Sequence, residues 1–422
     1  MWILLASSAA AAAPPEARQS ARGLAPETRF YVPPPDSGAN EQVADLLRSR
    51  RRADARRLAA LVATPQAVWF TSGSPQEVEA AVRRTTRSAA LERRVPVLVA
   101  YNIPFRDCGN LSAGGAADAA AYRDWIDGFA RGVGDGKAVV ILEPDSLGII
   151  PFNTTIYGAA DSCQPTVTDG QGKVVPAPGA SPTERYAQLN YAVDSLEAKA
   201  PRASVYLDGT HSAWLGVGEA AYRLVTAGVR RAQGFFLNVS NFQPTDQLAQ
   251  FGTWVSDCIT AATAGPSGAA GHFDWCPSQY NPATNYTLDF SPEFAATVTA
   301  ALLKMMGGAT ATTRFVLDTS RNGQGPWTPA AAYPDAQNWC NPPRRGAGRR
   351  PTADPRHTAG RRRAVDQDTG RVGRLLHARH RRREHRSRMG RHRRPGCGRL
   401  VPAAGGAVGH PGPASALARG AT

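Results

Sequence analysis

Two aspartates stand where a carboxyl group could do chemistry. Asp107 in "YNIPFRDCG" and Asp145 in "ILEPD" each follow, by a few residues, a short apolar segment with the composition of a β-strand. Two carboxyl groups that flank a cleft are the minimum equipment for cleaving a glycosidic bond, because one can stay protonated as the acid while its neighbour is charged. A single aspartate at a strand end is about as often a cap on the next helix or turn. The pairing favours the catalytic interpretation.

Aromatic residues form a second group at the expected strand ends. A sugar ring could stack its apolar C–H face on an aromatic ring there, and Asp208 and Asn241 could bond its hydroxyl groups. Core packing is the usual role of any single tryptophan, but four aromatic side chains at one rim favour sugar binding. The four are Trp69, Tyr101, Trp214 and Trp339.

These residues need elements that bring them together, and the sequence predicts six strands. Apolar, β-branched segments that end abruptly in polar residues recur at 67–70, 95–102, 138–145, 204–209, 234–241 and 314–320. Continuous apolar runs of this length are typical of strands buried on both faces, as in a parallel sheet.

Helices are predicted between these strands, at 74–94, 116–133, 181–200 and 218–229. Strand–helix–strand units at this spacing build either a doubly wound sheet or a barrel, and both place their active sites at the carboxyl ends of the strands. No G-x-G-x-x-G follows the first strand, which disfavours a nucleotide-binding sheet. Two inserts rich in Gly, Pro, Ser and Asn, 151–182 and 261–292, are predicted to be long loops that bind substrate.

The positive charge of the chain is concentrated at one end. Residues 344–422 hold 21 Arg and four acidic residues, a net +17, so the +15 of the whole chain leaves −2 for the rest. Only this end supports a nucleic-acid partner, and it has no Phe, Tyr or Trp for base stacking. We therefore expect no nucleic-acid partner.

The N-terminus and the cysteines bear on localisation. The start "MWILLASSAAAAAPPEA" is similar to the apolar core of a secretory signal peptide without its basic first part, so residues 1–27 are predicted to be a leader and the protein to be secreted. No later run is long and apolar enough to predict a membrane span. Neither the six cysteines nor the few histidines of the body have the spacing of a metal site, so no metal and no cofactor is expected.

Six blocks carry a resemblance to a known family. They are "YNIPFRDCG", "ILEPDSLG", "YLDGTHSAWLG", "FFLNVSNF", "FVLDTSRNGQGPW" and "WCNPP". In this order, over residues 28–354, they resemble the signature blocks of glycoside hydrolase family six, the inverting cellulases. The resemblance implies an α/β fold, a distorted and incomplete parallel β/α barrel of about seven strands that is otherwise like a TIM barrel. It also implies a monomer that hydrolyses β-1,4-glucosidic bonds in cellulose or cello-oligosaccharides.

The resemblance implies a role for each matching residue. Asp145 matches the general acid, and Asp107 matches the neighbouring carboxylate that raises the pKa of the acid. Tyr101 matches the tyrosine that crowds the distorted sugar, and Ser112 lies in the loop that orients the attacking water. The glucose-binding positions match Asp208, His211, Trp214, Asn241 and Trp339.

Three further expectations accompany the resemblance. Cys108 is expected to pair with Cys163 and Cys258 with Cys276, the first pair with the better family support. Internal cleavage of the glucan is favoured over processive release by a cellobiohydrolase. A β-glucan-binding protein without catalysis is the alternative from another class, since it would need the aromatic platform but no protonated acid.

Residues 355–422 are predicted to be read in a displaced frame and to be disordered. The family continues with a strand similar to "LWIK" and a loop similar to "PGESDG", which this chain lacks. Written in GC-rich codons and read one base later, "RAVDQDTGRVGRLLHA" allows "PWIKTPGESDGSC". A genuine Arg-rich tail is the alternative. The prediction implies a truncated barrel over 28–354, an unpaired Cys340, and little or no cellulase activity for the chain as written.

Overall fold

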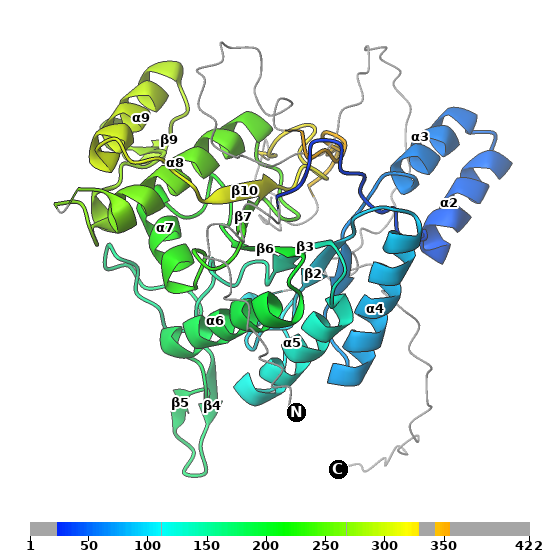
Figure 1. Cartoon of the computed structure of the whole chain (residues 1–422), viewed down its shortest axis with the longest axis horizontal. Helices are drawn as coiled ribbons and strands as arrows, with labels where there is room; N and C mark the ends of the chain where they lie inside the picture. Colours follow the sequence, from blue (N-terminus) through cyan, green and yellow to red (C-terminus); the bar gives the residue numbers. More distant parts are fainter. Residues whose placement is uncertain (1–22, 111, 267, 329–341, 355–422) are drawn as a thin grey trace, which may run out of the picture.

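A six-stranded parallel sheet organises the protein. The computed structural model describes residues 23–110, 112–266, 268–328 and 342–354. Neighbouring strands in the sheet follow the order β1 (Val68–Phe70), β2 (Val97–Ala100), β3 (Ala138–Leu142), β6 (Ala203–Asp208), β7 (Gly234–Leu237) and β10 (Arg314–Leu317), and every pairing is parallel. All six predicted strands are confirmed (Figure 1).

Both faces of the sheet are buried, as the apolar runs predict. Alternate residues such as Leu98 and Val140 face the layer of helices, whereas Val99, Tyr101 and Ile141 belong to a separate cluster on the opposite face. This is the pattern of a β/α barrel wall, and the fold is α/β with a sheet that is barrel-like in its strand order. In the described residues β1 and β10 remain the two edges of the sheet, and no pairing joins them.

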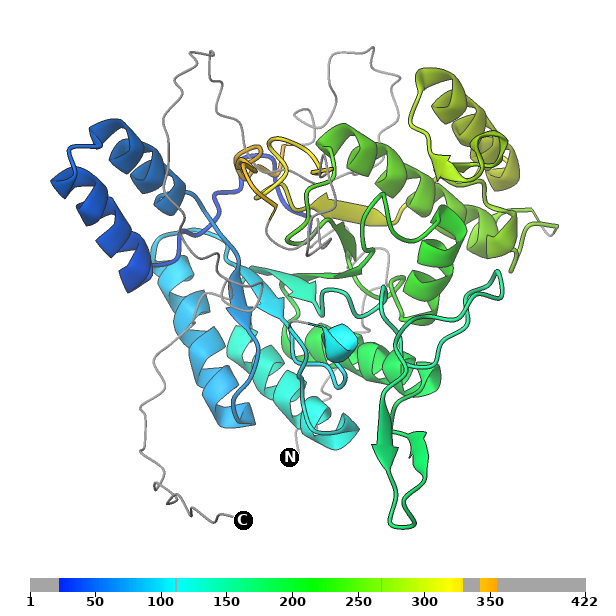
Figure 2. The same ribbon diagram turned by 180° about the vertical axis from the view of Figure 1, so that it is seen from behind.

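The four predicted helices are confirmed as α4 (Pro75–Leu91), α5 (Ala119–Val133), α6 (Pro182–Lys199) and α7 (Val217–Thr226). Helix α4 starts at a capping box in which the Ser74 side chain accepts from the Glu77 N–H while Glu77 accepts from the Ser74 N–H. Ser181 caps α6 in the same position, with Pro182 in the first turn. Helices α4, α5 and α6 lie side by side along one face of the sheet (Figures 1 and 2).

Four more helices were not predicted: α2 (Ser37–Arg48), α3 (Arg52–Val62), α8 (Thr245–Ala264) and α9 (Pro292–Met306). Helix α8 is buried around most of its circumference, because α7, α9 and β10 all pack on it. Such a helix lacks the one-sided apolar stripe from which a surface helix is recognised. Helices α2 and α3 form a largely exposed pair with only Ala55 buried.

The two inserts contain regular structure as well as loops, which corrects the prediction. The first holds the antiparallel hairpin β4 (Thr166–Thr168) and β5 (Val174–Pro176), which projects away from the body of the molecule (Figures 1 and 2). The second holds η2 (Phe273–Trp275), η3 (Pro282–Thr284) and the short pair β8 (Tyr280–Asn281) and β9 (Thr287–Leu288). Both expected disulfides, Cys108–Cys163 and Cys258–Cys276, are confirmed.

The segment 342–354 packs against the loop that follows β10. The Gly348 N–H donates to the Thr319 carbonyl at 3.0 Å, and the Gly323 N–H donates to the Gly346 carbonyl at 2.9 Å. The Arg345 guanidinium donates to the carbonyls of Gly325 and Pro326 at 2.7 and 3.1 Å. Residues up to Asp354, which is buried, therefore belong to the same folded body.

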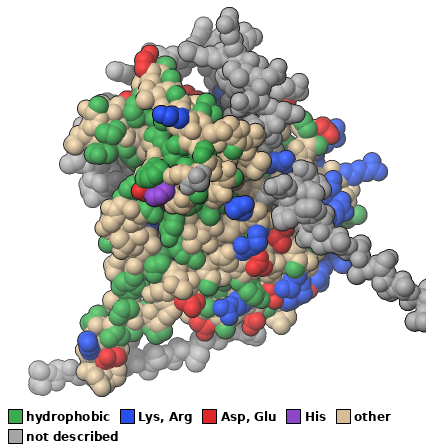
Figure 3. All heavy atoms as spheres, turned by 60° about the vertical axis from the view of Figure 1, so that its left-hand side comes forward, with side chains coloured by type: hydrophobic (Ala, Val, Ile, Leu, Met, Phe, Trp, Pro, Cys, Tyr) green, Lys and Arg blue, Asp and Glu red, His purple; other side chains and the backbone are tan. Residues whose placement is uncertain are grey.

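Several predictions fall on parts of the chain that the structure does not describe. Residues 1–22 of the expected leader, Trp339, Cys340 and the expected displaced-frame segment 355–422 lie outside the described residues. Over the part that is described, no helix is long and apolar enough to cross a membrane. Acidic and basic side chains are interspersed on the face shown in Figure 3, in keeping with a near-neutral body.

Candidate active site

Three carboxyl groups meet at the carboxyl ends of three adjacent strands. Strand β3 pairs with β2 on one side and with β6 on the other. Asp107 lies in η1 (Asp107–Gly109) beyond β2, Asp145 lies three residues beyond β3, and Asp208 is the last residue of β6. The parallel register therefore brings together groups that are far apart in the sequence.

Asp145 has the electrostatics of a proton donor. Burial raises the pKa of this carboxyl to about 8, and the neighbouring charges of Asp208 and then Asp107 act in the same direction. No hydrogen bond reaches the Asp145 carboxyl from any residue in the described ranges. Nothing there offsets the cost of charging it, so the protonated form is favoured at neutral pH.

Asp208 lies under the loop that carries Asp145. Its side chain accepts from the Leu147 N–H at 3.1 Å and from the Thr210 N–H at 2.9 Å. Burial raises the pKa of Asp208, while these N–H groups lower it. Since hydrogen bonds from N–H groups stabilise a carboxylate, we assign the proton to Asp145 and the charge to Asp208.

Asp208, one of the predicted glucose-binding positions, is buried beneath the loop that carries Asp145. Only 2% of the residue is exposed. One of its oxygens accepts from the loop that carries Asp145, residues 143–150, which we call the acid loop, and the other from the end of its own strand. It is brought next to Asp145, and its charge adds to the rise in the pKa of that carboxyl.

Asp107 lies in a loop that is closed by its own neighbours. Its carboxyl accepts from the Ser112 N–H at 2.7 Å and from the Asn110 side chain at 3.3 Å. Burial raises the pKa of Asp107, and the hydrogen bond from Ser112 opposes that rise. Ser112 is thus brought to Asp107 through its backbone. The Arg106 guanidinium ties the loop down by donating to the carbonyls of Tyr101, Thr71 and Ser112 at 2.7, 3.0 and 3.0 Å.

Tyr101 connects the carboxyl groups to the buried cluster on the second face of the sheet. Its ring meets Trp69 edge-on at 5.5 Å, and the Arg106 guanidinium lies over it at 4.7 Å from the ring centre. Burial raises the pKa of the Tyr101 hydroxyl, and the charges of Asp145 and Asp107 add to the rise. The hydroxyl therefore stays protonated and lies within the electrostatic reach of both carboxyls.

His211 and Trp214 lie on the turn after β6. Burial lowers the pKa of His211 to about 4, so its ring is neutral, and Nδ1 accepts from the Ala213 N–H at 3.1 Å. The Trp214 ring lies 5.6 Å from His211 and packs on Gly148 of the acid loop, where an added Cβ would lie 2.6 Å from the indole. Asn241 lies beyond β7, and its Oδ1 accepts from its neighbour Phe242 at 2.8 Å. Trp339, the remaining predicted position, lies outside the described residues.

Sequence reasoning missed the charged residues that support these loops: Arg106, Glu143, Arg185 and Arg223. Glu143 is fully buried and accepts from the N–H groups of Asn102 and Ile103 at 2.8 and 3.0 Å, which fixes the start of the Asp107 loop. Burial raises the pKa of Glu143 to about 7. A signal was available for Arg185, because it lies on the same buried stripe of α6 as Leu189, Ala192 and Leu196. A charged residue on an apolar stripe needs buried partners.

Comparison with known proteins identifies the family. The chain belongs to glycosyl hydrolases family 6, whose family model matches residues 25–360, so the resemblance of the six blocks is confirmed. Endoglucanase 1 of Streptomyces sp. (strain KSM-9) is 32% identical over 293 residues, 69% of this chain and 59% of that protein. Endoglucanase 1 of Streptomyces halstedii is 37% identical over 235 residues, 56% of this chain and 65% of that protein. The chain therefore spans less than two thirds of the length of these relatives.

A solved structure is similar over more of its length. The endoglucanase Cel6 from Mycobacterium tuberculosis, in complex with methyl-cellobiosyl-4-deoxy-4-thio-β-D-cellobioside, matches with a TM-score of 0.50 and 32% identity, covering 77% of this chain and 82% of that one. Relatives named exoglucanase or cellobiohydrolase also match, at 28% and 27% identity.

Proposed function

We propose that this barrel hydrolyses β-1,4-glucosidic bonds in cellulose or related β-glucans, with inversion at the anomeric carbon. The observation that carries the proposal is the half-buried Asp145 carboxyl beside those of Asp107 and Asp208, with a pKa raised to about 8 that keeps it protonated at neutral pH. The cello-oligosaccharide analogue in the similar Mycobacterium tuberculosis endoglucanase supports a glucan as the substrate.

The proposed steps follow from the charges of the three groups. Asp145 protonates the departing glycosidic oxygen, while the negative charge of Asp107 stabilises the oxocarbenium-like transition state and holds the proton on the acid. Tyr101 crowds the sugar at the cleavage point, and the Ser112 loop orients the water that attacks the opposite face. The proton that this water loses passes to a base in the loop similar to "PGESDG", which the chain as written lacks. An inverting enzyme keeps roughly 6.5–9.5 Å between acid and base to admit that water.

Substrate contacts are proposed for Trp69, His211, Trp214, Asn241 and Trp339. A neutral His211 can donate to a sugar hydroxyl, and the Trp214 ring is held by its contact with Gly148. Asp208 is proposed to act on Asp145 and not on the sugar, because it is buried.

We propose internal cleavage as the mode of attack, since the two Streptomyces endoglucanases match at 32% and 37% identity and the relative named exoglucanase at 28%. A fast fall in the viscosity of carboxymethylcellulose, relative to the release of reducing ends, is the expected result. Viscosity that falls only in step with reducing ends would favour processive release.

We also propose that the enzyme is a secreted monomer and that the frame is displaced after about Asp354. Sequencing the gene around codon 354 tests the second point directly. A chain translated after the reading frame beyond codon 354 has been restored, which we call the frame-restored chain, is expected to hydrolyse glucans far faster than the 422-residue chain. Equal rates from the two chains, with a clean read of the present frame, would contradict it.

The stereochemistry of the first product tests the reaction. Proton NMR of cellotetraose hydrolysis by the frame-restored chain is expected to show the α-anomer first, with the β-anomer appearing later by mutarotation. Asp145→Asn is the matched control and should release neither. Tight glucan binding with no product from the frame-restored chain would support the non-catalytic alternative.

A further inference from the structure

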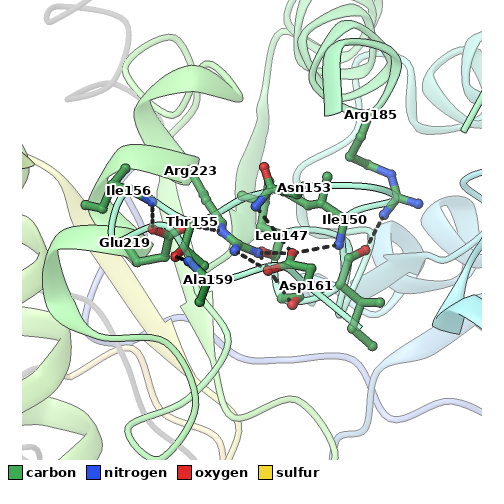
Figure 4. Close-up of polar contacts among 12 residues, drawn as sticks. Leu147, Ile150, Asn153, Thr155, Ile156, Ala159, Asp161, Arg185, Glu219 and Arg223 are labelled. Carbon is green, nitrogen blue, oxygen red and sulfur yellow. Dashed lines mark hydrogen bonds and ion pairs between the residues drawn. The ribbon is translucent and has the colours of Figure 1, made fainter. Parts of the chain in front are cut away.

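Two buried arginines approach the acid loop from behind. Arg185 of α6 is 2% exposed, and its Nη1 donates to the carbonyls of Ser146 and Ile149 at 2.9 and 3.2 Å. Arg223 of α7 is fully buried, and its Nη1 donates to the Leu147 carbonyl at 2.8 Å. Figure 4 shows the segment that contains Leu147 and Ile150 between the two guanidinium groups.

The two arginines hold the loop in different ways. Arg223 is itself fixed by carboxylates: Asp161 accepts from Nη1 and Nη2 at 2.9 and 2.8 Å, and Glu219 accepts from Nε at 2.5 Å. Such a two-pronged pair sets both distance and orientation. Arg223 therefore anchors the acid loop to α7 and to the first insert.

Arg185 reaches two loops at once. Its Nη2 donates to the carbonyls of Pro104 and Phe105 at 2.8 and 3.4 Å, while Nη1 serves the acid loop. Pro104 and Phe105 lead directly into Arg106 and Asp107. One planar guanidinium, whose nitrogens keep fixed spacing, thus spans the segment before Asp107 and the segment after Asp145.

We propose that Arg185 is a positioning residue that sets the separation between the Asp107 and Asp145 carboxyls. Arg223 binds the acid loop and Asp161 but not the segment before Asp107, so it does not set that separation. The inference deepens the proposed function and rests on it, because the Asp107 charge can hold the proton on Asp145 only from close by.

The charges around these groups make the proposal measurable. The groups that face Asp145 are Asp208 from β6, Asp107 from η1 and the Tyr101 hydroxyl beyond β2. Those that face Arg185 are Glu143, Tyr122, Asp208 and Tyr101. The neighbouring charges that raise the Asp145 pKa are those of Asp208 and Asp107. A change of that pKa in an Arg185 variant therefore reports on the distance between the carboxyl groups.

The test is the pKa of Asp145, read from its side-chain ¹³C resonance in the full 422-residue chain, with Asp145→Asn to assign the signal. Arg185→Lys keeps the charge but cannot bridge both loops. We expect the Asp145 pKa to fall by about one unit as Asp107 moves away and water enters. Arg223→Lys should shift it less.

Leu189→Ala, one turn further along α6, is the matched control. Leu189 is fully buried but touches neither loop through a hydrogen bond, so its removal lowers Tm and leaves the Asp145 pKa unchanged. Arg185→Gln, whose amide reaches only one of the loops, is the second variant and is expected to show the same fall if the lysine variant does not fold. An Asp145 pKa that is the same in the Arg185 variants as in Leu189→Ala would overturn the proposal.

Activity gives an independent readout. In the frame-restored chain, Arg185→Lys should lower kcat by about tenfold with little change in KM, and should move the alkaline limb of the pH profile down by the shift seen in the NMR titration. If no form of the protein hydrolyses glucan, the proposed function fails, while the NMR titration still decides whether Arg185 positions Asp145.

Discussion

The two loops that carry Asp107 and Asp145 are held by opposite means. The acid loop after β3 is fixed from behind by Arg185 and Arg223, which come from helices of the barrel wall, and from below by Asp208. The loop of Asp107 is closed mainly by its own residues, through the Arg106 side chain and the Ser112 N–H. The proposed proton donor, Asp145, is thus placed by the scaffold, while Asp107 is placed mainly by local contacts, which are more easily adjusted.

One covalent link joins these two loops on the outer side. Cys108 follows Asp107 directly, and its partner Cys163 lies two residues beyond Asp161, the carboxylate that holds Arg223. The disulfide therefore couples the locally held loop to the anchored one, as Arg185 does on the inner side.

The largest expected difference between the loops is in catalysis. Asp145→Asn should lower kcat on cellotetraose by about 10³-fold, since it removes the proton donor. Asp107→Asn should cost less, about 10–100-fold, because it removes a charge that supports the acid and the transition state. Steady-state kinetics of both variants in the frame-restored chain provide the measurement, and an equal loss in both would erase the distinction.

Asp145→Asn should raise the stability of the protein although it lowers kcat. Its folded-state pKa is raised, so the folded protein holds a proton that the unfolded chain loses above its ordinary value near 4, and stability falls as the pH rises from there toward 8. Asp145→Asn removes this penalty and should stabilise the protein at pH 7 by on the order of 2 kcal/mol, with no gain at pH 4. Urea unfolding at the two pH values tests the sign. A loss of stability at pH 7 would contradict it.

The two disulfides should separate stability from catalysis. In the loop-entropy description, Cys108–Cys163 with a separation of 55 residues contributes about 4 kcal/mol and Cys258–Cys276 with a separation of 18 about 3 kcal/mol. Replacing either pair with serine should lower Tm, but only loss of the first should also move the pH profile. A shift of the profile after loss of Cys258–Cys276 would show that the coupling of the loops is not specific.

The smallest expected effect concerns Ser112. Its backbone N–H, and not its hydroxyl, binds Asp107 at 2.7 Å, so Ser112→Ala should leave the Asp107 pKa unchanged. If the hydroxyl orients the attacking water, kcat should fall by a factor of roughly 3–10, the worth of one neutral hydrogen bond. Ser112→Pro, which removes the N–H, should instead raise the Asp107 pKa. A changed Asp107 pKa in Ser112→Ala would show that the Ser112 hydroxyl, and not its N–H, sets the pKa of Asp107.

The sequence predicts the six strands of the sheet better than the helices and hairpin that surround them. Six apolar runs became six strands, because strands buried on both faces leave a continuous signal such as "AVVIL". Helix α8 was missed because it too is buried on most sides and shows no stripe. The hairpin β4–β5 was missed because its strands are short and mostly exposed.

Within the site, the strand-end aspartates could be predicted and their partners could not. Asp107 and Asp145 follow apolar runs by a few residues, so their position at the sheet edge follows from the chain alone. Arg185 and Arg223 bind backbone carbonyls, which every residue carries, so no pattern of letters records the pairing. Asp208 was placed correctly at a strand end, but its burial depends on how the acid loop folds over it.

The most direct test of the account is whether Asp145 is needed only to protonate the leaving group. A 2,4-dinitrophenyl β-cellobioside has a leaving group that departs without a proton. Asp145→Asn in the frame-restored chain should therefore keep nearly the parent kcat on this substrate while losing about 10³-fold on cellotetraose. An equally large loss on both substrates would contradict the assignment of Asp145 as the general acid.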